Sequence, residues 1–301
     1  YPSVARLEHI GNRIVEDLVT YRKAHKIGTA VLGMSGGLDS ALTAALCKKA
    51  GWNVLGLTLP IHQDPIETDR GVEAIGALGL SHNHIDLTQA YDAMLGLMGD
   101  DELMDGDSYS IKIRKGNIRA RLRMITLYNF ASKNKGLVLS TDNFSERVQS
   151  FFSLNGDVGD LSPIQSLTKS WEVPMLAKMV GVPEKTVRAT PTDGLGIDAG
   201  DEAQFGYTYL ESDLLTFALT DAISEVGHDI DTVIDHMNMD EETFALFDKM
   251  YNRAKNGAFK RHWPAMIDHP LEDRYALLDG MDKCIAPHVV PERENQNRLS
   301  M

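Results

Sequence analysis

The stretch that decides the fold is "VLGMSGGLDSALTAAL", residues 31–46. An apolar run over 29–34 leads into two adjacent glycines, Gly36 and Gly37, and a helical pattern begins at Asp39. Glycines can adopt positive φ and let the backbone approach a ligand, and a helix N-terminus presents unpaired N–H groups to an anion. Asp39 would repel phosphate unless a divalent cation lay between them. The loop therefore predicts a site for a nucleotide triphosphate with magnesium.

A purely structural interpretation of the same loop is a Gly-Gly turn followed by a serine or aspartate helix cap. The loop is not a Walker A motif, because the pattern G-x-x-x-x-G-K-[ST] does not occur in it. The placement of S-G-G-x-D-S between a buried strand and a helix nevertheless favours phosphate binding over a simple turn.

Strand and helix patterns alternate through the first half of the chain. Apolar runs predict strands at 29–34, 53–60, 82–87 and 136–141. Helical spacing of apolar residues predicts helices at 3–26, 39–50, 66–79, 88–98 and 117–134. This order predicts an α/β fold with a doubly wound, mostly parallel sheet and helices on both faces. Ligands bind beyond the carboxyl ends of such strands, so Gly33–Ser40 and Thr141–Glu146 are expected to share one rim.

The second half of the chain has a less regular pattern. Residues 190–206 are rich in glycine and aspartate and predict a loop. We expect its residues from about 193 to 206 to close over a bound ligand. Helical spacing returns over 208–222 and 239–254.

Composition limits the classes of function. The 301 residues carry a net charge of −13, which argues against a broad nucleic-acid interface. No apolar stretch is long enough to span a membrane, and the N-terminus lacks a signal-peptide pattern. Cys47 and Cys284 are the only cysteines, and Cys47 lies in a helical pattern that predicts a buried thiol. These features predict a cytoplasmic protein with no membrane partner.

Several motifs together carry a resemblance to a known family. "SGGLDS" resembles the pyrophosphatase loop of the N-type ATP pyrophosphatases, which cleave ATP between its α and β phosphates. The chain then resembles the NAD synthetases through a set of motifs in the same order: "KGNIRARLRM" (115–124), "STDNFSE" (140–146), "FFSLNGDVGDLSPI" (151–164), "LTKS" (167–170), "PTDGL" (191–195) and "FKRHWP" (259–264). The resemblance implies one domain over 1–264, and leaves 265–301 as a C-terminal extension.

The resemblance also implies an activity. Because no glutaminase domain precedes the motifs, the chain is similar to the stand-alone, ammonia-using NAD synthetases. These ligases amidate deamido-NAD to NAD: the nicotinate carboxylate attacks the α-phosphorus of ATP, and ammonia then displaces AMP. ATP is the co-substrate, magnesium the cofactor, and a homodimer the expected assembly.

Residue roles follow from the resemblance, position by position. Asp39 and Lys169 match the residues that act on the triphosphate, and Asp39 and Glu146 match magnesium ligands. The residues that match the ATP site are Gly33, Met34, Ser35, Gly36, Gly37, Leu38, Asp39, Ser40, Thr141, Lys169 and Thr192. Those that match the deamido-NAD site are Arg121, Asp160 and Lys260.

The chain departs from the family pattern on the dinucleotide side. Leu154 stands where the family usually has a lysine, and Phe259 stands where it usually has a histidine. Two other interpretations therefore remain open: an ATP-pyrophosphatase amidoligase with another acceptor, GMP-synthetase-like or RNA-modifying, and a non-catalytic nucleotide-binding relative. The acidic net charge counts against an RNA substrate, and the presence of Asp39, Glu146 and Lys169 counts against a non-catalytic protein.

Overall fold

A computed structural model describes residues 2–98, 108–189 and 200–261 of the chain. Its centre is a four-stranded sheet in the order β3-β2-β1-β4, with every neighbouring pair parallel. The strands are β1 (Thr29–Gly33), β2 (Asn53–Thr58), β3 (Ser81–His84) and β4 (Leu137–Val138). The strand order reverses at β1, which pairs with β2 on one side and with β4 on the other. The predicted doubly wound α/β fold is confirmed.

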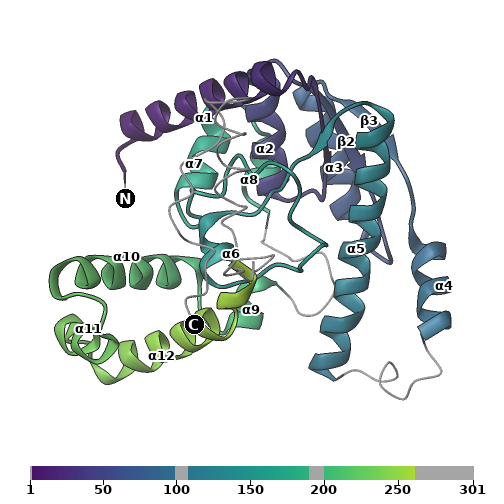
Figure 1. Cartoon of the computed structure of the whole chain (residues 1–301). Helices are drawn as coiled ribbons and strands as arrows, with labels where there is room; N and C mark the ends of the chain where they lie inside the picture. Colours follow the sequence, from purple (N-terminus) through teal and green to yellow (C-terminus); the bar gives the residue numbers. More distant parts are fainter. Residues whose placement is uncertain (1, 99–107, 190–199, 262–301) are drawn as a thin grey trace, which may run out of the picture.

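Helices connect and cover the strands (Figure 1). Those of the first half are α1 (Val4–His25), α2 (Leu38–Lys49), α3 (Pro65–Leu78), α4 (Thr88–Met98) and α5 (Tyr109–Lys133). Those of the second half are α6 (Phe144–Val148), α7 (Glu172–Met179), α8 (Glu184–Val187), α9 (Asp201–Phe205), α10 (Tyr209–Val226), α11 (Ile230–Met237), α12 (Glu241–Asn256) and α13 (Ala258–Arg261). Within the described ranges, none of these helices is long and apolar enough to cross a bilayer.

The sheet buries both faces, because alternate side chains of a strand point to opposite sides. Ala30 and Leu32 of β1 belong to the apolar core formed with α1, α2, α3 and α7. Val31, between them, belongs to the core on the other face, where Met124 and Leu127 of α5 cover the sheet. Cys47 of α2 is fully buried, as predicted, and burial raises the pKa of its thiol. Cys284 lies outside the described residues.

Several predicted boundaries are wrong, for local reasons. Helix α5 begins at Tyr109 rather than at 117, because the Ser108 side chain caps it by accepting from the Ile111 N–H. The predicted strands 82–87 and 136–141 shorten to β3 and β4. Within the predicted loop 190–206, residues 201–205 form α9, whose Phe205 is buried; residues 190–199 lie outside the described part of the chain.

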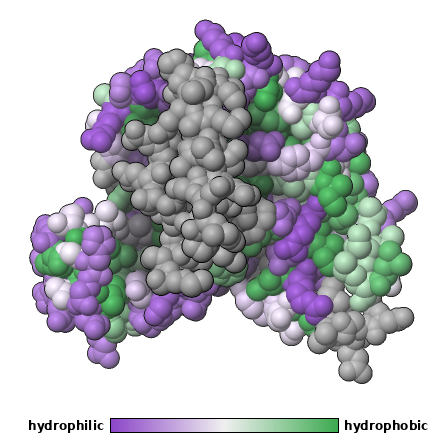
Figure 2. Space-filling model, viewed as in Figure 1, coloured by the Kyte–Doolittle hydropathy of each residue, from purple (hydrophilic) through white to green (hydrophobic). Residues whose placement is uncertain are grey.

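Helices α10, α11 and α12 form a lobe beside the sheet body (Figures 1 and 2). The lobe has its own apolar core, in which Phe205, Tyr207 and Tyr209 pack with Phe247 and Met250. Its outer surface carries both hydrophilic and hydrophobic side chains (Figure 2). The predicted helices 208–222 and 239–254 correspond to α10 and α12, whereas α11 between them was not predicted.

The glycine-rich loop after β1 is held against helix α3. Gly36 has φ +84°, and a Cβ atom there would lie 2.1 Å from the Glu67 carbonyl oxygen. Gly71 of α3 is equally constrained, because its Cβ would lie 2.5 Å from the Met34 carbonyl oxygen. The Arg70 side chain closes the contact by donating to the Gly36 carbonyl at 3.4 Å. Two glycines thus fix the distance between the loop and α3.

This contact predicts that alanine in place of two different glycines changes the stability of the protein in opposite directions. Gly36→Ala should lose stability, because the left-handed conformation alone costs a side chain about 1–2 kcal/mol, before the clash with Glu67. Gly76→Ala, in the last turn of α3 with nothing within 4 Å of its Cβ position, should instead gain about 0.4–1 kcal/mol, because alanine reduces the freedom of the unfolded chain. Thermal unfolding of both variants measures the difference, and a Gly36→Ala protein as stable as the parent would contradict the packing.

Candidate active site

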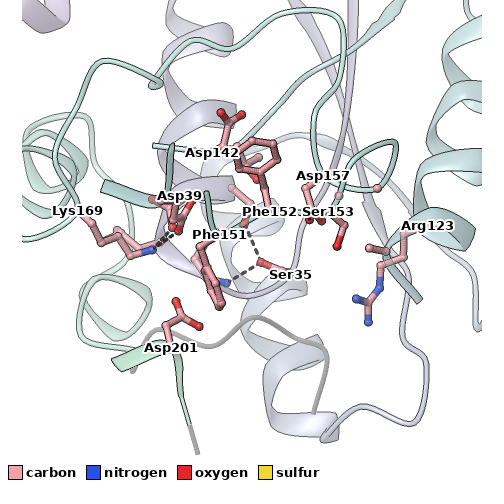
Figure 3. A pocket seen from close by; sticks show the side chains of 18 of the residues that line it. Ser35, Asp39, Arg123, Asp142, Phe151, Phe152, Ser153, Asp157, Lys169 and Asp201 are labelled. Atoms are coloured by element: carbon pink, nitrogen blue, oxygen red, sulfur yellow. Dashed lines mark hydrogen bonds and ion pairs between the residues drawn. The ribbon is translucent and has the colours of Figure 1, made fainter. Parts of the chain in front are cut away.

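A cavity of about 590 Å³ opens at the carboxyl ends of β1 and β4, where the strand order reverses. This is the position at which open parallel sheets bind their ligands, and the volume suits a nucleotide. The loop after β1 and the segment after β4 both line it, as the sequence predicted, and α5, α10 and α12 contribute further side chains. Figure 3 shows Lys169 and Asp39 toward one end and Arg123 at the other.

The predicted ATP residues lie mostly in this cavity. All of residues 33–40 except Gly36 line it, together with Thr141 and Lys169. Gly36 does not line the cavity: it is buried against α3, where its positive φ serves that packing, and its contact with ATP stays a prediction. Gly37 lines the cavity, but the positive φ expected of it is wrong, because its φ is −86°, an ordinary conformation at the N-cap of α2. Thr192 lies outside the described residues.

Three charged side chains meet at the N-terminus of α2. The Lys169 ammonium donates to the Asp39 carboxylate and lies 3.6 Å from the Glu146 Oε1 atom (Figure 3). The side chains of Lys169, Asp39 and Glu146 are only 9%, 14% and 16% exposed. The lysine therefore places one positive charge between two carboxylates that would otherwise repel each other inside the cavity.

The protonation equilibria of this cluster are strongly shifted. Burial raises the pKa of Glu146 well above its usual value; Lys169 opposes the shift, and Asp39 adds to it. Burial disfavours the charge of Lys169, but Asp39 and Glu146 outweigh it and hold the pKa of its ammonium above the usual range. Lys169 is consequently a permanent cation in this site.

Asn143 orients both carboxylates. Its side-chain amide donates to Asp39 Oδ1 at 3.1 Å, and its carbonyl oxygen accepts from the Glu146 N–H at 3.0 Å. The Glu146 carboxylate in turn accepts from the Asn143 N–H at 3.3 Å, which completes a capping box at the start of α6. The spacing N-x-x-E in "DNFSE" is the sequence signal for this arrangement.

The residues predicted for the dinucleotide side are dispersed. Lys260 lines the cavity, where its ammonium donates to the carbonyls of Ser150 and Phe152 at 3.1 and 2.7 Å. Arg121 is exposed outside the cavity and donates to the Leu154 carbonyl at 3.2 Å. Asp160 is also outside it.

Asp160 is held by hydrogen bonds to α5 and to strand β4. Its carboxylate accepts from the Val138 N–H at 2.8 Å and from the Tyr128 hydroxyl at 2.9 Å. Its own N–H donates to the Val138 carbonyl at 2.7 Å, so this residue completes the hydrogen bonding of β4 at the edge of the sheet.

Several cavity residues were not found from the sequence. Phe151 and Phe152 line it, and the Arg253 guanidinium, also in the lining, lies 5.3 Å from the centre of the Phe151 ring. Arg123 donates to the Leu59 carbonyl at 3.0 Å. Asp201 is 3% exposed and accepts from the Tyr209 hydroxyl at 2.9 Å. Phe151, Phe152 and Arg123 lie within the quoted motifs, but their contacts join segments far apart in the chain, and no local pattern shows those contacts.

The donor set fits a magnesium ion. Asp39 and Glu146 offer carboxylate oxygens, which are the ligands that magnesium prefers, and phosphate oxygens and water usually complete its coordination. Among the residues that the structure describes, no group of three or more His, Cys, Asp or Glu side chains forms a metal site by itself. The pair is thus suited to a metal that arrives with a phosphorylated ligand.

Fold and site together define the class: an α/β protein with a parallel sheet and a cavity at the switch point, where folds of this class bind nucleotides. The model of the NAD synthase family matches residues 10–264, and the chain belongs to that family. The NH(3)-dependent NAD(+) synthetase of Finegoldia magna is 38% identical over 207 residues, which cover 67% of this chain and 82% of that protein. The enzyme of the same name from Methanosarcina mazei is 32% identical over 224 residues, covering 72% and 84%.

Solved structures agree with this assignment. An NH3-dependent NAD synthetase from Campylobacter jejuni, in complex with nitrate, superposes with a TM-score of 0.67 at 25% identity and covers 87% of this chain and 99% of that one. An NMN synthetase from Francisella tularensis superposes with a TM-score of 0.67 at 27% identity, covering 83% and 95%.

The buried charge cluster predicts a large stability effect for one lysine. Lys169→Met leaves two carboxylates facing each other, and removing one partner of a buried ion pair typically costs about 3–5 kcal/mol. The loss should shrink as pH falls, because protonation of Glu146 ends the repulsion. Lys185→Met is the matched control: its ion pair with Glu73 is exposed, and such pairs contribute about 0–1 kcal/mol. Urea unfolding measures both, and equal small losses would contradict the buried cluster.

Proposed function

We propose that this protein is an ammonia-dependent NAD(+) synthetase, which amidates deamido-NAD to NAD with ATP and ammonia. The observation that carries the proposal is the cluster of Asp39, Lys169 and Glu146 at the N-terminus of α2, inside a cavity of nucleotide size. Membership in the NAD synthase family and the names of the relatives support the same reaction.

The reaction has two steps, adenylation of the acid and displacement of AMP by ammonia, and neither step needs an oxidant or a reductant. An oxygen of the nicotinate carboxylate attacks the α-phosphorus of ATP; the bond to the β-phosphate oxygen breaks, and pyrophosphate leaves. The nitrogen of ammonia then attacks the adenylated carbonyl carbon, AMP leaves with the bonding electrons, and one proton is lost from the nitrogen. The first step turns a stable anion into an electrophile, which is why the site must stabilise phosphate charge above all.

Each group at the phosphate end has a defined task in this proposal. The N–H groups in the first turn of α2 point at the triphosphate, because Gly37 provides no side chain to cap them. Lys169 shifts from the carboxylates to the phosphate oxygens and follows the charge onto pyrophosphate. Asp39 and Glu146 would hold magnesium, which neutralises the triphosphate when bound. Ser35, Ser40 and Thr141 line the cavity and offer hydroxyls to the nucleotide.

One other acid is a candidate for the acceptor. The structural similarity to an NMN synthetase favours a mononucleotide acid as the second candidate. Leu154, in the place of a usual family lysine, leaves the dinucleotide side with less positive charge. Mass spectrometry of products from ATP, ammonium and each acid separates the two. NAD with AMP from the dinucleotide supports the proposal, and turnover of the mononucleotide alone would overturn it.

The role of Asp39 gives a sharp kinetic prediction. Asp39→Asn keeps the hydrogen bond to Asn143 possible but removes the charge that would hold magnesium. Losing one charged group of a preorganised site typically costs about 10²–10³ in rate. Pyrophosphate release, followed by a coupled assay, should fall by that factor, whereas Asp69→Asn on the exposed side of α3 should leave it unchanged. Near-normal release from Asp39→Asn would remove the triphosphate interpretation.

We also propose a homodimer, with residues 1–264 as one catalytic domain and 265–301 as an extension. Arg121, Ile125 and Tyr128 share one face of α5, since they are spaced four and three residues apart. Ile125 is 65% exposed and Tyr128 is 42% exposed on that face. A two-fold interface here would bring the exposed Arg121 of one protomer toward the partner's site, because such an interface presents the same patch twice.

The dimer has a direct test with a matched control. Ile125→Glu places a charge on the proposed interface and should give monomers in light scattering, with loss of NAD formation. Leu97→Glu changes a side chain on α4 that is 85% exposed and should leave the dimer intact. A parent protein that is a fully active monomer at micromolar concentration would contradict the proposal.

A further inference from the structure

A buried carboxylate connects the lobe to the two segments that carry the charge cluster. Asp213 lies on α10, is 2% exposed and does not line the cavity. Its Oδ1 atom accepts from the Ser145 hydroxyl at 2.5 Å. Its Oδ2 atom accepts from the Ser170 hydroxyl at 2.5 Å and from the Ser170 N–H at 3.2 Å.

The two serines are the chain neighbours of two site residues. Ser145 precedes Glu146 on α6, and Ser170 follows Lys169 in the loop before α7. The Lys169 N–H donates to the Ser145 hydroxyl at 2.9 Å, so the lysine backbone, the serine and Asp213 form one chain of hydrogen bonds. The backbones that present Glu146 and Lys169 are thus joined through a single carboxylate.

We propose that Asp213 is a positioning residue that sets the spacing between Lys169 and Glu146. An ionised carboxylate only accepts hydrogen bonds, so it can take all three donors at once. Because the Asp213 carboxylate accepts a hydrogen bond from the Ser145 hydroxyl, the Ser145 oxygen keeps a lone pair that accepts from the Lys169 N–H. The inference deepens the proposed function, since a triphosphate site depends on where this ammonium lies relative to the carboxylates.

An asparagine cannot reproduce this pattern. Its amide has one acceptor oxygen and a donor group in place of the other, so one of the two serines loses its acceptor. The side chain keeps its size, and the packing around it is unchanged. The Asp213→Asn substitution therefore tests the hydrogen-bond pattern without opening a cavity.

The adjacent residue provides a control for a merely structural effect. Ser212 is 1% exposed and accepts from the Gln149 side chain at 2.8 Å, and Gln149 in turn accepts from the Tyr207 hydroxyl. This second network also attaches α10 to the body, through the Gln149 side chain, which bonds Ser212 and Tyr207 rather than the Ser145 hydroxyl. Ser212→Ala should lower stability and leave the spacing of the charge cluster intact.

The experiment compares Asp213→Asn and Ser212→Ala for thermal stability, for kcat and KM with each substrate, and for acetylation of Lys169 by a small acylating reagent. Displacement by about 1 Å at a reacting site costs about 10²-fold in rate, so kcat of Asp213→Asn should fall about 10- to 100-fold. The KM for deamido-NAD should stay within about twofold, since Asp213 lies away from the cavity. Acetylation of Lys169, read by peptide mass spectrometry, should accelerate several-fold in Asp213→Asn alone.

The outcomes separate the inference from the proposed function. Equal loss of stability in both variants, with unchanged kcat and unchanged Lys169 acetylation in Asp213→Asn, overturns the positioning role. If the parent protein makes no NAD, the proposed function fails, and the acetylation rate still decides the inference. Should Asp213→Asn not fold, Ser145→Ala removes the same link from the other side and is judged by the same measurements.

Discussion

The ion cluster of Lys169 with Asp39 and Glu146 is the interaction on which the site depends. Two carboxylates less than one-fifth exposed would repel each other strongly without a cation between them. The Lys169 ammonium supplies that positive charge in the free protein. When a phosphorylated ligand binds, the same ammonium can bind the phosphate oxygens instead. In this cluster a positive and two negative groups lie side by side, so the phosphate oxygens of a polyanion can bind the lysine while its metal binds the carboxylates.

The fold supplies the three charges from separate elements. Asp39 comes from the first turn of α2, Glu146 from the capped start of α6, and Lys169 from the loop before α7. The first two meet because β1 and β4 are neighbours and parallel, so their carboxyl ends lie at one edge of the sheet. The third is fixed through Ser145 and Asp213, which extends the support of the site into the helical lobe.

Local patterns in the sequence predict the body of this fold and miss the contacts between distant segments. The apolar run, the glycines and the helix start at 31–46 predict the strand, the turn and the phosphate end of the cavity, because all three signals are local. The glycines predict a tight turn at Gly36 but not that the turn packs against Glu67, since sequence cannot tell which neighbour a glycine makes room for. Asp213 was missed for the related reason that its partners lie far away in the chain, and the distant contact of Asn143 with Asp39 was missed in the same way.

We propose that this site activates a carboxylate by transferring the adenylyl group of ATP to it. Deamido-NAD labelled with oxygen-18 in its nicotinate carboxylate tests that claim most directly. Attack on the α-phosphorus leaves one carboxylate oxygen on AMP when ammonia displaces it, so mass spectrometry should find one oxygen-18 in AMP and none in pyrophosphate. Label in pyrophosphate or inorganic phosphate, or NAD formed with unlabelled AMP, would contradict the account.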